Sequence, residues 1–223
     1  MSMGACSGWK DFVWRLLEEV GATVNLESDA CEGASLQRLA DRAVSKLRAF
    51  PEIKRLRMLR NALRTKRINR RAHGELLDKI ENIVPTEKPG YSVHRRPPEQ
   101  TRALAGIFWP LVVTTNYDDV LLDAQKRSFP SQPELLGRNR TDCQAVLRSL
   151  DHPSARIHWA VQGFLGGQAG VPVKDDPVPP LFDEVVVGHR QYQRAIHDAP
   201  HFRRVFAEVF QRKSFMFVGS GLS

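Results

Sequence analysis

The chain has 223 residues, of which 42% are hydrophobic, enough to bury the core of a globular domain and to exclude a disordered polymer. No apolar run approaches the roughly 18 residues of a membrane span, and the N-terminus lacks the basic and apolar regions of a secretory signal, so a cytoplasmic location is expected. The formal net charge of +8 is uneven, because residues 38–71 carry +11, with 13 Lys and Arg against 2 Asp and Glu, and the remainder carries −3.

Four helices are predicted in the first half of the chain, each from apolar residues at helical spacing. They are Trp9–Val20, Leu36–Phe50, a helix that begins at Pro51, and Ala72–Val84. Gly21 is predicted to cap the first helix at its C-terminus, and Ser35 to cap the second at its N-terminus. The third helix is expected to turn four apolar side chains inward: Ile53, Leu56, Leu59 and Leu63.

Strands and helices alternate in the second half of the chain. The predicted strands are Leu111–Thr115, Ile157–Val161, Glu184–Gly188 and Ser214–Val218. The predicted helices are Asp118–Lys126 and Ala199–Arg212, the second with Phe202, Val205, Phe206, Val209 and Phe210 inward. Apolar strands that alternate with helices are typical of a parallel sheet covered on both faces. We therefore expect an α/β fold, a three-layer, Rossmann-like and mostly parallel sheet, in a single domain over residues 1–223 with a helical insertion at about 35–105.

Polar residues directly follow the first predicted strand, in the string Val113-Thr114-Thr115-Asn116-Tyr117-Asp118-Asp119. Ligands bind sheets of this kind at the carboxyl ends of the strands. Hydroxyl, amide and carboxylate groups suit ribose hydroxyls, which both donate and accept hydrogen bonds. The alternative is structural, with Asn116 or Asp118 capping the next helix.

A glycine-containing turn follows the last predicted strand, in Phe217-Val218-Gly219-Ser220-Gly221. Glycine lets the backbone approach a phosphate or ribose closely, and free N–H groups there can bind anions. A short glycine turn after a strand is also common in proteins without a ligand, so this signal alone is weak.

Taken together and in this order, the two strings resemble the SIR2-like (sirtuin-related) family, whose members share a Thr-x-Asn-x-Asp turn, a His-Gly strand end and a final strand with a Gly-Ser-like turn. The string Thr114–Asp118 is similar to that of the bacterial, defence-associated NADase branch, and Val185–Val187 with Tyr192 resembles a later element of it. The resemblance spans about Leu111–Ser223 and implies NAD as the substrate. It also implies that Asn116 holds the ribose and a water.

The resemblance implies roles for further residues around the same nucleotide. Thr115 and Asp118 would shape the ribose pocket, and Gly219, Ser220 and Gly221 would contact NAD. The zinc-binding cysteines of the deacetylase branch are absent, which makes protein deacetylation less expected than NAD+ hydrolysis. Only Cys6, Cys31 and Cys143 are present, without a Cys-x-x-Cys pair, and no metal is expected.

The family's catalytic histidine has no direct counterpart in this chain. The His-Gly pair should fall near Ile157–Gly163, where Gln162-Gly163 has glutamine in its place. His158 lies four residues earlier, on the same side of a strand but about 13 Å further back at about 3.3 Å per residue. His158 is therefore a candidate catalytic base and Gln162 and Gly163 are candidate NAD contacts. The alternative is that His158 is a structural, partly buried histidine.

The ends of the chain also depart from the family pattern. Family members open with a strand and a Gly-Ala-Gly-x-Ser loop that cradles the dinucleotide, followed by a segment like Gly8–Phe12, and they continue past the position of Ser223. We therefore expect a chain that is truncated at both ends.

The function that the resemblance implies is hydrolysis of NAD+ in a bacterial anti-phage defence system, with a homo-oligomer or a fused or partner defence subunit as further partners. One alternative is a catalytically inactive module that only binds nucleotide or mediates an interaction. Another is a basic adaptor that binds nucleic acid through Arg38–Arg71, although that segment holds only one aromatic residue, Phe50, for stacking on bases. The plainest interpretation of the basic segment is the solvated face of an amphipathic helix.

Overall fold

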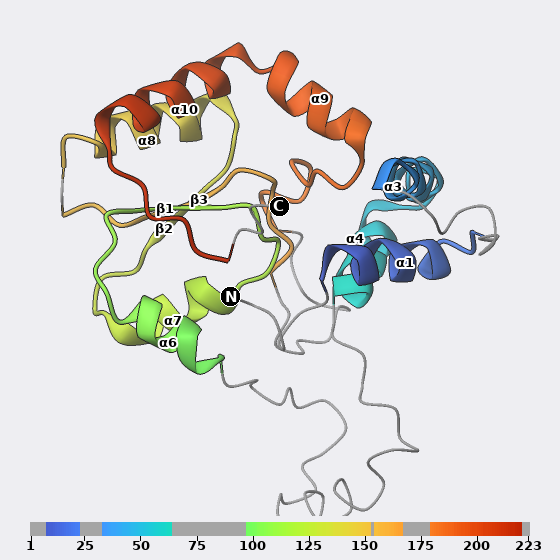
Figure 1. Cartoon of the computed structure of the whole chain (residues 1–223), viewed down its shortest axis with the longest axis horizontal. Helices are drawn as coiled ribbons and strands as arrows, with labels where there is room; N and C mark the ends of the chain where they lie inside the picture. The colour runs from blue at the N-terminus through green and yellow to red at the C-terminus, as the bar shows by residue number, and fades with distance from the viewer. Residues whose placement is uncertain (1–7, 23–32, 64–96, 153, 167–178, 220–223) are drawn as a thin grey trace, which may run out of the picture.

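The computed structural model describes residues 8–22, 33–63, 97–152, 154–166 and 179–219 (Figure 1). Within them the sheet has three parallel strands in the order β1-β3-β2: β1 is Leu111–Thr114, β2 is Glu134–Leu136 and β3 is Ile157–Ala160. The central strand is β3, and every one of its side chains is buried. This is the burial expected for a parallel strand that is paired on both edges and covered on both faces.

Helices cover both faces of the sheet (Figure 1). One face carries α8 (Arg140–Ser149) and α10 (Pro200–Arg212), and the other carries α6 (Glu99–Ala105) and α7 (Val120–Ser128). Because side chains alternate along a strand, Ile157 and Trp159 pack in the core beneath α8 and α10, whereas Ala160 packs with Leu122 of α7. The predicted three-layer, Rossmann-like α/β architecture is confirmed.

The N-terminal helices pack together beside the sheet, as Figure 1 shows, and share one apolar core. They are α1 (Trp9–Glu19), α3 (Gly33–Leu47) and α4 (Glu52–Leu63). The first three predicted helices are confirmed, and Gly21 follows α1 with the positive φ of 64° that suits a helix end. The N-cap prediction for Ser35 is wrong because α3 already begins at Gly33. Ile53 is 59% exposed, since no described neighbour covers the first turn of α4.

Two predicted strands are absent from the described sheet. Residues 184–188 form a turn and an extended segment, because their polar groups are bonded elsewhere: Val186 N–H donates to the Gln162 carbonyl (3.0 Å), and the Glu184 carboxylate accepts from Asn139 N–H (3.2 Å). Residues 214–218 are extended without a described ladder partner, and Phe217 is 64% exposed. Phe210, expected inward, is also half-exposed: it lies outside the core that buries Val209, and its ring stacks on that of Phe215 (4.6 Å between ring centres).

Four elements that the sequence pattern did not predict complete the described fold. They are β2, α6, α8 and α9 (His189–His197). β2 has only three residues, and α9 has only Tyr192, Ala195 and Ile196 as apolar residues, so each offers few positions from which an element could be predicted. The predicted helix Ala72–Val84 lies outside the described residues.

Candidate functional site

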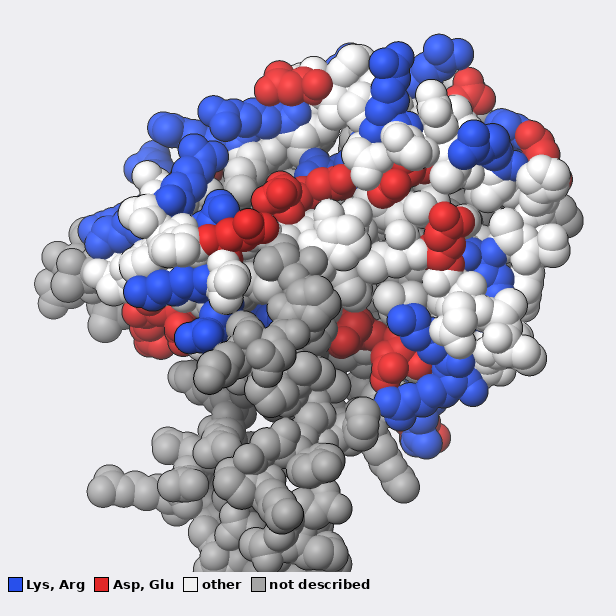
Figure 2. Space-filling view, turned by 180° about the vertical axis from the view of Figure 1, so that it is seen from behind, with Lys and Arg blue, Asp and Glu red and all other residues white. Residues whose placement is uncertain are grey.

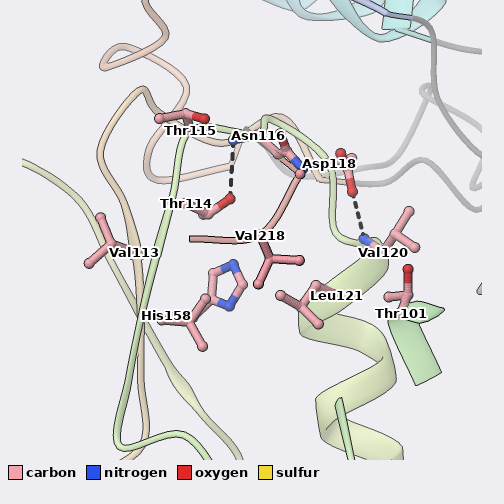
Figure 3. A pocket seen from close by; sticks show the side chains of 12 residues that line it. Thr101, Val113, Thr114, Thr115, Asn116, Asp118, Val120, Leu121, His158 and Val218 are labelled. Atoms are coloured by element: carbon pink, nitrogen blue, oxygen red, sulfur yellow. Dashed lines mark hydrogen bonds between the residues drawn. The ribbon is translucent and has the colours of Figure 1, made fainter. Parts of the chain in front are cut away.

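A cavity of about 140 Å³ lies beside the carboxyl end of β1 (Figure 3). Four parts of the chain meet there: β1 with the turn that follows it, the start of α7, His158 of β3, and the C-terminal Val218 and Gly219. Thr101 of α6, which lies on the same face of the sheet as α7, also lines the cavity. The edge at which the sequence analysis placed a ligand therefore does hold a polar, concave surface.

Five of the predicted site residues line this cavity together: Thr115, Asn116, Asp118, His158 and Gly219. Thr115 and Asn116 are exposed at its mouth, whereas Asp118 is buried. Within the turn, Asn116 N–H donates to Thr114 Oγ1 (3.1 Å), and Val120 N–H donates to Asp118 Oδ1 (3.0 Å), as drawn in Figure 3. The second bond satisfies the first backbone donor of α7. Asp118 thus has a structural task at the helix start in addition to its place in the cavity wall.

Tyr117, which the sequence analysis assigned no role, holds the turn in place. Its side chain is buried in the apolar core that the N-terminal helices share, and its hydroxyl donates to the Val186 carbonyl. Its own carbonyl accepts from Leu165 N–H (2.8 Å), and its ring lies 5.6 Å from that of Phe12 in α1. Burial raises the pKa of Tyr117, so the phenol stays a neutral donor. The signal for this role was a single aromatic residue inside an otherwise polar string.

His158 points into the space between Thr114, Leu121 and Val218 (Figure 3). It is 2% exposed, and its Nδ1 lies 3.3 Å from Oε1 of Gln125, a buried amide on α7. Burial, and to a lesser degree the positive charge of Lys126, lowers the pKa of His158 to about 4. The ring is therefore neutral at pH 7. With the amide oxygen as acceptor, Nδ1 carries the proton and Nε2 is left with a lone pair.

Gln125 is a second residue that the sequence analysis missed. It is 1% exposed and sits three residues after the buried Leu122, on the inward face of α7. A polar residue at an inward helical position is the signal that pointed to it. It orients the His158 ring from the layer beneath the sheet.

Gln162 and Gly163 do not line the cavity. β3 ends at Ala160, so the strand alternation that would put positions 158 and 162 on one side does not extend to Gln162. Gly163 has φ 86°, and a Cβ there would lie 2.5 Å from the Val185 nitrogen. Both residues serve the packing of the turn against residues 184–186. Ser220 and Gly221 lie outside the described residues.

The described part of the basic segment, Arg38–Leu63, is not one continuous basic surface. Arg60 is 2% exposed and its Nε donates to the Leu165 carbonyl (2.8 Å), so it fastens α4 to the loop after β3. On the face in Figure 2, Lys and Arg side chains lie interspersed with Asp and Glu. Binding of nucleic acid stays a prediction, with fewer exposed cations than the sequence count suggests.

The fold and the cavity define the class of the protein: a Rossmann-like α/β protein with a polar site at the carboxyl edge of its parallel sheet. The chain belongs to the SIR2-like family, because the family model described as SIR2-like domain matches residues 110–223, just over half of its length. SIR2-like domains bind NAD, and the cavity lies within the matched region except for Thr101. A comparison with curated proteins gives no match.

Two further searches of the described residues concern metals and membranes. No group of three or more His, Cys, Asp and Glu side chains in that part of the chain is arranged to hold a metal ion. Among the helices that the structure describes, none combines the length and the apolar character needed to cross a membrane.

Proposed function

We propose that this protein binds NAD+ in the cavity at the end of β1 and hydrolyses its nicotinamide–ribose bond, as part of a bacterial anti-phage defence system. The supporting observation is that Asn116, Asp118, His158 and Gly219, which come from three distant parts of the chain, line one cavity. Membership of the SIR2-like family supports NAD as the ligand.

The size of the cavity limits which part of NAD it can hold. Sites for whole ligands of this kind measure about 300–1,000 Å³. The described cavity, at about 140 Å³, has room for the reacting ribose and little more. In the proposed arrangement the ribose of the scissile bond enters it, with Thr115 and Asn116 at the mouth and Asp118 in the wall.

The reaction breaks the bond between ribose C1′ and the nicotinamide nitrogen, and nicotinamide leaves with the bonding electron pair. The oxocarbenium-like ribose is then captured by a water, which forms the new C1′–O bond and releases a proton. Asn116 has a side-chain amide that can hold both a ribose hydroxyl and this water. Because the cation is strongly electrophilic, the water needs positioning more than it needs a strong base.

The neutral His158 fits that modest requirement. Its low pKa makes it a weak proton acceptor, but the lone pair on Nε2 accepts a hydrogen bond from a hydroxyl or a water. His158 is therefore proposed to orient the ribose or the water rather than to remove a full proton. Gln162, the alternative location for the base, does not line the cavity.

The proposal is tested by measuring NAD+ consumption and nicotinamide release with the purified chain and with Asn116→Ala. We expect the variant to lose about 100-fold or more in rate, the effect of removing one positioned polar group from a reacting centre. Gln211→Ala, which removes an exposed amide from the end of α10, is the matched control and should keep the parent rate.

Either of two results would contradict hydrolysis at this site: equal rates in the parent chain and Asn116→Ala, or no nicotinamide release at high protein concentration. A parallel measurement of NAD+ binding separates the alternatives. Binding that needs Asn116 but gives no turnover would identify the inactive nucleotide-binding module instead.

A further inference from the structure

A second cavity, of about 80 Å³, lies between the helical unit and the segment that leads into α9. Its floor is apolar and buried, formed by Val44 and Leu47 of α3, Leu59 of α4, and Phe182, Val185 and Val187. Charged side chains occur at its edge. No residue lines both this cavity and the one beside β1, so the two are separate sites.

We propose that this second cavity binds a small aliphatic carboxylate, with Arg55 as the residue that recognises the anion. Arg55 is partly buried, and its Nε is fully buried with no hydrogen-bond partner among the described residues. Its guanidinium carbon lies 5.7 Å from the centre of the Phe182 ring, which orients the group across the cavity. Because the Nε has almost no accessible surface, a carboxylate in the cavity would be met by the terminal N–H groups of the guanidinium.

The charge at the edge of the cavity favours a single negative charge on the ligand. Arg48 and Arg55 contribute two positive charges, and Asp183 contributes one negative charge. No ion pair between described residues involves these three side chains, and the described residues that line the cavity carry a formal net charge of +1. The Gln191 side-chain oxygen accepts from Val187 N–H (2.9 Å), and its amide nitrogen donates one of its two N–H groups to the Val185 carbonyl (3.2 Å).

The volume and the apolar floor define the rest of the ligand. A cavity of about 150 Å³ takes a benzene ring, so 80 Å³ is too small for an aromatic acid and suits a group of about three carbons. The ligand class is therefore a compact aliphatic carboxylate, such as isobutyrate, either as a free acid or as the C-terminal carboxylate of a peptide chain. A phosphate would leave the apolar floor without a partner.

The test is a ligand-observed NMR titration of the full chain with isobutyrate and with isobutyramide, a neutral molecule of the same shape. We expect saturable binding of isobutyrate, with a dissociation constant of about a millimolar for so small a ligand, and binding of the amide about ten-fold weaker or less. N-acetylvaline, which mimics the C-terminus of a peptide chain, distinguishes the two possible sources of the carboxylate. It should bind more tightly than isobutyrate if the site takes the C-terminus of a peptide chain, and more weakly if it takes a free acid.

Variants of α4 residues test whether isobutyrate binds in the second cavity. Arg55→Gln should weaken isobutyrate binding about ten-fold, and Arg55→Lys, which keeps the charge but lacks the planar pair of terminal guanidinium donors, should also weaken it. Arg57→Gln, an exposed position on the same helix, should bind like the parent chain. Circular dichroism confirms that each variant is folded. Equal binding of the acid and the amide by the parent chain, or no saturation at tens of millimolar, would overturn the proposal whatever the variants do.

Discussion

At the scale of single residues, burial decides what His158 can do. The sequence has a histidine near the expected catalytic position. A histidine in solution has a pKa of 6.5, whereas His158 has a pKa of about 4 and is therefore a much weaker base. The shift follows from the surrounding layers, because α7 and the strands exclude water from the ring. The residue is thus neutral over the whole physiological range and acts as a hydrogen-bonding group.

The same burial makes stability depend on pH. Unfolded His158 binds a proton below about pH 6.5, whereas folded His158 does so only near pH 4, so the unfolded state gains protons first as the pH falls. We expect the free energy of unfolding to drop by about 1.4 kcal/mol for each pH unit in that window. Urea unfolding at about pH 7, 6 and 5 should give a shallower pH dependence for His158→Gln than for the parent chain.

The control for this experiment is His152→Gln, which replaces an exposed histidine in the turn after α8. It should unfold with the pH dependence of the parent chain. If His158→Gln and the parent chain lose stability in parallel between pH 6.5 and 4, the folded His158 is not held neutral.

At the scale of elements, the turn after β3 determines how the two halves of the fold meet. Gly163 adopts φ 86°, and Val185 packs against its Cα so closely that a side chain would collide with the backbone. Glycine suits this position for both reasons. The turn brings residues 184–186 next to Gln162, and the Val186 carbonyl there accepts from the hydroxyl of Tyr117, in the turn that follows β1.

Gly163→Ala should therefore destabilise the protein by about 2 kcal/mol or more, the combined effect of a strained φ and a backbone clash. Gly106→Ala is the matched control: it lies at the end of α6 with φ −74°, and a new Cβ there meets only ordinary contacts, the nearest at 3.4 Å. Thermal and urea unfolding of both variants give the comparison. A loss no larger in Gly163→Ala than in Gly106→Ala would rule out this account of the turn.

At the scale of the whole molecule, contacts between residues far apart in the sequence join the helical unit to the sheet. Asp41 Oδ1 of α3 accepts from Arg190 N–H at the start of α9 (3.1 Å), Arg60 Nε donates to the Leu165 carbonyl, and Phe12 packs on Tyr117. Helices of this length are marginal alone in water, so their stability depends on such packing. Both cavities lie near these junctions.

Asp41→Ala tests the junction between α3 and α9. It removes the acceptor for a backbone donor at a helix start, and we expect unfolding to require about 1 kcal/mol less free energy. Asp123→Ala is the control, since it removes only an exposed carboxylate that pairs with Arg127 within α7 (2.6 Å) and should change stability by about 0.5 kcal/mol or less. Equal losses in urea unfolding would show that the Asp41 contact does not stabilise the assembly of the two units.

Regular periodicity was the part of the fold that could be predicted. The stripes in α1, α3 and α10 and the apolar runs of β1 and β3 repeat at helical or strand spacing, and they form where expected. Residues 184–188 and 214–218 have equally apolar runs but do not join the described sheet. A strand needs a partner for its backbone groups as well as suitable side chains, and single-segment patterns contain no information on the partner.

In the candidate site, too, local sequence patterns could be predicted, whereas contacts between distant residues could not. The sequence by itself determined the fold class, the family and the polar string at the end of β1, because these depend on local pattern and motif. Only the tertiary structure decided that His158, and not Gln162, lies in the cavity with Asn116, that Tyr117 and Gln125 hold these residues in position, and that Arg60 is buried. Burial and long-range hydrogen bonds depend on which surfaces meet in three dimensions, and that is decided by the packing of all the layers together.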